Sequence, residues 1–164
     1  MGYIEMLPVL TLACMLHETG HILLTLILGG KITEVTVSCF GIQMAGCTSM
    51  SYLRESIAVI AGPVFGMTAA LIAACLGFYY FAGLSFVLSV FNLLPLRILD
   101  GGRFLSCLML SRFELETSEK ISKMADVITL FAFFSAAVYL LVYFGNITLL
   151  CCTGVLLFIY CQEQ

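Results

Sequence analysis

The chain alternates long apolar runs with short polar stretches. A membrane-spanning helix needs about 20 mostly apolar residues. Five runs approach or exceed that length: 6–29, 56–81, 84–110, 126–144 and 147–161. We therefore predict an all-α polytopic membrane protein with about five transmembrane helices, and a single integral-membrane domain over residues 1–164.

Two stretches between these runs are more polar. In 31–52, β-branched residues alternate with Thr and Ser, and Gly41 and Gly46 offer turns. This pattern favours short strands, so we expect a small membrane-associated β-hairpin after the first helix. The stretch 111–123 is rich in charged residues and is predicted to be a solvated loop or a short surface helix.

Composition indicates that lipid surrounds most of this protein. Hydrophobic residues make up 62% of the chain and charged residues 10%, whereas a soluble domain carries about 25% charged residues. The net charge of −3 says little by itself, but nothing in the sequence resembles a basic nucleic-acid-binding face, so no nucleic-acid partner is expected. The eight cysteines lie mostly in apolar runs without a C-x-x-C pair, so they are interpreted as small buried hydrophobes.

The few basic residues predict an orientation. With five spans, all seven Lys and Arg residues fall on one side of the membrane, and the turns on the other side have none. Loops rich in Lys and Arg face the cytoplasm. The N-terminus is therefore expected outside and the C-terminus in the cytoplasm.

The first apolar run contains His17, Glu18 and His21 in an H-E-x-x-H motif. Residues four apart lie on one face of a helix, so the two imidazoles can bind one zinc ion while Glu18 acts as general base. These are the only two histidines, and a chance spacing of four would arise in about one such chain in eighty. The alternative is a polar helix seam, but ionisable residues inside a membrane helix are functional by default.

A catalytic zinc ion takes three protein ligands and leaves one position for water. The candidates for the third ligand are the two aspartates, Asp100 and Asp126. His21 lies about 12 Å along a helix from Gly29, and Asp100 lies at a similar distance before the polar stretch that begins at Ser111. These matching depths favour Asp100, and Asp126 is interpreted as a helix N-cap.

The segment before Asp100 is expected to be irregular. Pro95 removes a backbone donor, and two glycines follow the aspartate. Irregular backbone at membrane depth is tolerated where it lines a watery cavity. Asn92 can donate its amide to a developing oxyanion or to the substrate backbone; the alternative is a hydrogen bond between helices.

Together these motifs resemble the site-2 protease family of intramembrane zinc metalloproteases. The matching features are the H-E-x-x-H motif, Ala61-Gly62-Pro63, and Asn92-x-x-Pro95 followed by Asp100-Gly101. The stretch 91–102 is similar to the bacterial sporulation branch in particular. The resemblance covers 6–110 as the core and leaves 125–161 as accessory transmembrane helices. One departure is Val64, because the family often has a polar residue after the Gly-Pro pair.

The resemblance implies one zinc ion per chain, held by His17, His21 and Asp100, with Glu18 as base and acid and Asn92 near the scissile bond. It implies hydrolysis of peptide bonds within or near transmembrane segments of membrane-bound precursors, in regulated intramembrane proteolysis. The expected partners are a transmembrane protein substrate, the lipid bilayer and a regulatory membrane protein. The expected location is a bacterial cell membrane, with the active site nearer the cytoplasmic side.

Two other functions are kept open. Membrane zinc transporters or sensors also place His and Asp at mid-depth, although they would not need Glu18 as a non-ligand. A catalytically silent homologue would bind membrane partners without cutting them.

Overall fold

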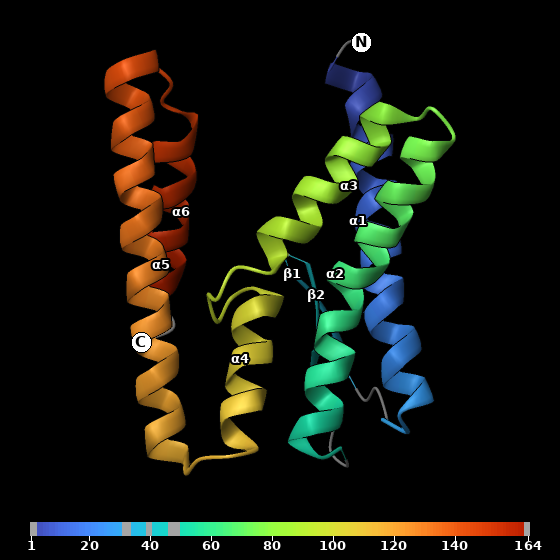
Figure 1. Ribbon diagram of the computed structural model, residues 1–164, viewed down its shortest axis with the longest axis vertical. Helices are drawn as coiled ribbons and strands as arrows, with labels where there is room; N and C mark the ends of the chain where they lie inside the picture. The colour runs from blue at the N-terminus through green and yellow to red at the C-terminus, as the bar shows by residue number, and fades with distance from the viewer. Residues whose placement is uncertain (1–2, 31–33, 39–40, 46–49, 163–164) are drawn as a thin grey trace.

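The computed structural model describes residues 3–30, 34–38, 41–45 and 50–162, and within these ranges the chain is largely helical (Figure 1). The elements in chain order are α1 (Tyr3–Ile27), β1 (Glu34–Ser38), β2 (Gly41–Ala45), α2 (Tyr52–Cys75), α3 (Tyr79–Asn92), α4 (Asp100–Leu110), α5 (Leu115–Phe144) and α6 (Thr148–Gln162). β1 and β2 pair antiparallel, with Glu34 opposite Ala45 and Ser38 opposite Gly41.

The helices form two groups that meet at α4. α1, α2 and α3 pack against one another, α4 packs on α2, and the antiparallel pair α5–α6 packs on α4 (Figure 1). The start of α1 and the α2–α3 and α5–α6 connections lie at one end of the molecule, and the end of α1, the start of α2 and the α4–α5 connection lie at the other. Arg54 is near the start of α2, Arg112 is in the α4–α5 connection and Lys120 is near the start of α5, so these basic residues belong to segments at this second end.

The predicted set of five transmembrane helices is wrong. Among the described residues, three helices are long and apolar enough to cross a membrane: α1 over Met6–Ile27, α2 and α5. The predicted third span is two helices, α3 and α4, and α6 has only 15 residues. Two strands do follow α1, but no observation on the described residues associates them with a membrane surface.

The charged stretch at 111–123 is mostly helical. α5 begins at Leu115, because Glu and Lys are good helix formers even where they end the apolar pattern. Lys120 pairs with Glu116 one turn earlier. Asp126 therefore lies inside α5, where it is 1% exposed. Its interpretation as an N-cap is wrong.

α1 and α2 approach closely because small residues lie between them. A methyl group added to Gly20 would lie 2.7 Å from the Ala61 carbonyl oxygen and 2.8 Å from Phe65 Cβ, which is too close for ordinary contact. Small residues let helix backbones approach each other in membranes. This approach brings the buried face of α1, with Ala13 and His17, against its neighbours.

The chain between α3 and α4 is a tight irregular segment at 93–99. It contains Pro95, which cannot continue the helical hydrogen bonding, and α3 ends just before it. Leu99 N donates to Leu96 O at 2.8 Å. Leu96 and Leu99 are buried in one apolar cluster with residues of α5 and α6. The α5–α6 pair thus covers the segment that leads into Asp100.

Candidate metal centre

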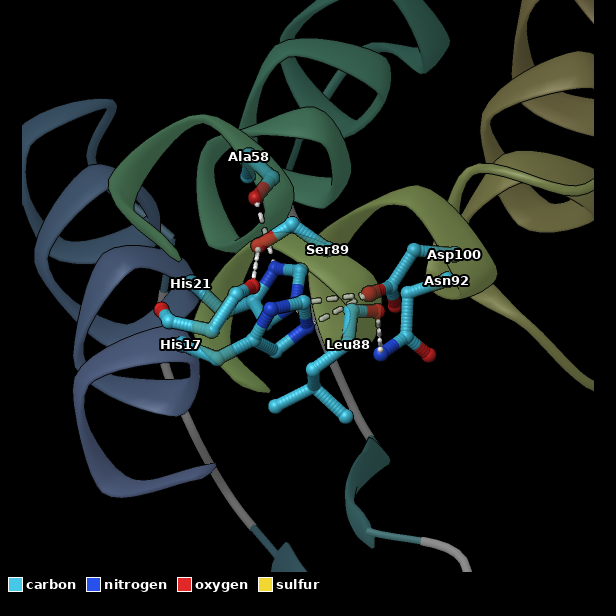
Figure 2. A network of polar contacts seen from close by, with 8 residues as sticks. His17, His21, Ala58, Leu88, Ser89, Asn92 and Asp100 are labelled. Atoms are coloured by element: carbon cyan, nitrogen blue, oxygen red, sulfur yellow. Dashed lines mark hydrogen bonds and ion pairs between the residues drawn. The ribbon is translucent and has the colours of Figure 1, made fainter. Parts of the chain in front are cut away.

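Three side chains, two from α1 and one from α4, converge among the four helices α1, α2, α3 and α4 (Figure 2). His17 Nε2 lies 2.9 Å from Asp100 Oδ2, and His21 Nε2 lies 3.1 Å from the same oxygen. The two Nε2 atoms are 3.3 Å apart. His17 is buried, and His21 and Asp100 are mostly buried. The three residues predicted as zinc ligands therefore lie together, although they come from positions far apart in the sequence.

The spacing of these atoms fits a small tetrahedral ion. Zinc binds His nitrogen and carboxylate oxygen at about 2.0–2.2 Å, so ligand atoms of a tetrahedral site lie about 3.3 Å apart. The observed separations of 2.9, 3.1 and 3.3 Å form a triangle of nearly that size. Two histidines and one carboxylate are also a ligand set of catalytic zinc. The residues present fit the ion.

The hydrogen bonding of His21 gives a second reason to place a metal ion here. His21 Nδ1 lies 3.0 Å from the Ala58 carbonyl oxygen. A carbonyl only accepts, so Nδ1 carries the hydrogen and Nε2 of the neutral ring presents a lone pair. That lone pair faces the carboxylate oxygen Asp100 Oδ2, which also carries electron pairs. A bound metal ion removes this conflict, and metal-binding histidines commonly donate their other N–H to a backbone carbonyl.

α2 also leaves the space in which the His21 ring lies. A methyl group added to Gly62 would overlap Nε2, Cε1 and Cδ2 of that ring. Glycine is used where another group must approach the backbone closely. The sequence singled out Ala61-Gly62-Pro63, but it did not indicate that Gly62 accommodates His21.

The other two predicted site residues are Glu18 on α1 and Asn92 at the end of α3. Glu18 is half-buried on α1, and among the described residues its carboxylate is not one of the grouped ligand atoms. Asn92 ends α3, and its Nδ2 donates to the Leu88 carbonyl oxygen at 3.0 Å (Figure 2). This bond lies within α3, so the alternative of a bond between helices does not describe it.

A partly buried ion pair beside the site was not predicted. Arg97 Nε donates to Asp126 Oδ2 at 2.7 Å, and Arg97 N donates to Asp126 Oδ1 at 3.0 Å. Asp126, the other candidate for the third ligand, is therefore bound to the segment that precedes Asp100. The available signal was a pair of opposite charges within apolar runs, since such residues tend to pair with each other in membranes.

Fold and site together define a class: a helical membrane protein with a buried His–His–carboxylate group suited to zinc. Residues 77–136 match the model of Peptidase family M50. In fold the chain is similar to the solved Site-2 Protease from Methanocaldococcus jannaschii, with a TM-score of 0.62 and 24% identity over 92% of this chain and 73% of that chain. No curated protein matches the sequence significantly.

These similarities agree with the resemblance seen in the sequence at the level of family and fold. The M50 match includes Asn92, Pro95 and Asp100 and ends within α5. It does not include α1. The H-E-x-x-H motif is therefore supported by the distances between its histidines and Asp100, and not by the family match. The narrower likeness to the sporulation branch stays a prediction.

Proposed function

We propose that this chain is an intramembrane zinc metalloprotease that hydrolyses peptide bonds within or near transmembrane segments of membrane-bound precursor proteins. The observation that carries the proposal is the meeting of His17 Nε2, His21 Nε2 and Asp100 Oδ2, with no separation above 3.3 Å. The match to Peptidase family M50 and the likeness in fold to a site-2 protease support this reaction class.

In this proposal His17, His21 and Asp100 hold one zinc ion. An ion held there would supply Lewis-acid chemistry and a water that is nucleophilic near neutral pH. Glu18 lies beside the first ligand, so its carboxylate can accept a proton from the attacking water and later give it to the leaving amine. The Ala58 carbonyl fixes the His21 tautomer that presents a lone pair at Nε2.

Asn92 is proposed to bind the substrate near the scissile bond. Its amide donates to the Leu88 carbonyl in the last turn of α3, and Asn side chains readily exchange such local backbone bonds. When it is directed at the substrate instead, the same N–H group can stabilise a developing oxyanion.

The substrate is proposed to be a transmembrane segment that unwinds before it is cut. The carbonyls of an intact helix are hydrogen-bonded to its own amides, so they are shielded from attack. Residues with low helix propensity near the cut should favour cleavage. We propose that this activity serves regulated proteolysis of precursors and that a membrane protein regulates it. We also propose that the chain is nearest to the bacterial sporulation branch of the family, because the stretch 91–102 resembles that branch.

The proposed orientation has the N-terminus outside and the C-terminus in the cytoplasm of a bacterial cell, with the site nearer the cytoplasmic side. Arg54 near the start of α2, Arg112 in the α4–α5 connection and Lys120 near the start of α5 support it, because these segments lie at one end of the molecule and the N-terminus lies at the other (Figure 1). Basic residues near membrane-spanning helices favour the cytoplasm.

Glu18→Gln tests the proposed reaction. A glutamine amide cannot accept the proton from water, so cleavage of co-expressed single-span precursors should fall by roughly a hundredfold or more. The zinc content should stay that of the wild type, because the Glu18 carboxylate is not grouped with the three ligand atoms. Immunoblots of doubly tagged precursors measure the first result, and elemental analysis measures the second.

Glu116→Gln is the matched control, since Glu116 pairs with Lys120 on the exposed surface of α5, and it should cleave like the wild type. Equal cleavage by the wild type and Glu18→Gln would contradict the mechanism. Zinc uptake into vesicles without cleavage of any precursor would favour a transporter instead.

A further inference from the structure

A partly buried ion pair joins α5 to the segment that leads to the third proposed ligand. Asp126 of α5 is 1% exposed, and its two carboxylate oxygens accept from Arg97, at 3.0 Å from the backbone N and 2.7 Å from Nε. Arg97 lies three residues before Asp100, in the connection between α3 and α4. One carboxylate thus binds both the backbone and the side chain of a single residue in this connection.

Apolar packing alone does not fix this connection. Residues 93–99 form neither helix nor strand. Leu96 and Leu99, on either side of Arg97, are buried with Leu130 of α5 and Leu156 of α6. Apolar contacts give little driving force where the competing solvent is lipid, so the directional bonds to Asp126 are the stronger constraint on the backbone at this point.

The connection also fits closely onto the first turn of α4. A methyl group added to Gly101 would overlap the Leu93 carbonyl, and one added to Gly102 would overlap the Leu96 carbonyl and the Arg97 nitrogen. The backbone at 93–97 and the start of α4 are therefore in direct contact. A shift of Arg97 is passed to Asp100, the first residue of α4.

We infer that the Arg97–Asp126 pair is a positioning device for the third zinc ligand. Asp126 holds Arg97, Arg97 holds the first turn of α4 in place, and Asp100 Oδ2 is thereby kept at the two histidines. The inference rests on the proposed zinc site, but its two residues are assigned no contact with metal or substrate. It gives α5, predicted from the sequence as an accessory helix, a part in building the site.

Zinc affinity and amide exchange test this inference together. Asp126→Asn removes the charge with little change in shape. We expect roughly tenfold weaker zinc affinity, the scale of losing a group that supports a metal ligand, measured against a competing chelator in detergent. Hydrogen–deuterium exchange of 93–99 should also be faster in the metal-free variant than in the metal-free wild type, because the Arg97 amide loses its charged partner.

A second variant covers the case in which Asp126→Asn does not fold. Arg97→Met combined with Asp126→Leu leaves no buried charge without a partner, a replacement that proteins often tolerate, and it should show both changes. Thr129→Val is the matched control, because Thr129 is also a buried polar residue of α5, but among the described residues its hydroxyl donates to the Ala125 carbonyl of its own helix and to no other group. It should show neither change.

Wild-type zinc affinity and wild-type exchange in the Asp126 variants would overturn the inference. Equal losses in Thr129→Val would also overturn it, because they would show general weakening of α5. Failure of the wild type itself to bind zinc would count against the proposed function instead, and the exchange comparison in metal-free protein would still decide whether Asp126 holds the 93–99 connection.

Discussion

His21 is held by two features of α2, a carbonyl that accepts from its ring and a glycine that leaves room for it. The Ala58 oxygen lies 3.0 Å from Nδ1, and any side chain at Gly62 would overlap the ring. The sequence could predict His17, His21 and Asp100, because ionisable residues are rare and costly within apolar runs. It could not predict which groups orient them, because these belong to another helix and one of them has no side chain.

Gly62→Ala should therefore displace the His21 ring and weaken zinc binding by roughly tenfold or more, the scale of losing a supporting group. Alanine favours a helix over glycine by about 1 kcal/mol, so a weaker α2 would not explain such a loss. Gly154→Ala is the control, since nothing lies within 4 Å of its added methyl group. Chelator competition measures both variants, and unchanged zinc affinity in Gly62→Ala would contradict the role of this glycine.

The length of an apolar run predicts the bounds of a helix best where the run ends at a clear polar boundary. α1 and α6 begin and end within a few residues of the predicted runs at 6–29 and 147–161. The run at 84–110 was predicted as one helix but forms parts of two, because Pro95 interrupts the helical hydrogen bonding. Hydropathy alone does not reveal such an interruption. α5 extends into a charged stretch, because charge does not end a helix.

The packing of α1 on α2 predicts a stability change at Gly20. Gly20→Val should lower the stability of the folded protein by about 1–3 kcal/mol, the usual cost of overpacking, because its side chain would meet the Ala61 carbonyl and Phe65. Gly83→Val on α3 is the control, since the space around Gly83 is open. Thermal unfolding in detergent measures the difference, and equal midpoints for the two variants would contradict the close contact.

Over the whole molecule, composition correctly indicates a membrane protein, and the structure shows which parts build the site. α1 supplies two proposed ligands, α4 supplies the third, and α2 forms the wall behind His21. The α5–α6 pair touches this group through α4 and the 93–99 connection. The sequence could not show this arrangement, because charges within apolar runs indicate that Arg97 and Asp126 need a partner but not which residue the partner is.

The zinc content of the purified protein tests the central claim most directly. The wild type should bind about one zinc ion per chain, as a site with three protein ligands and one open position requires. Asp100→Ala should lose nearly all of it, because Asp100 Oδ2 is the atom that both histidines face. A wild type without zinc, or an Asp100→Ala variant with the full amount, would contradict the account.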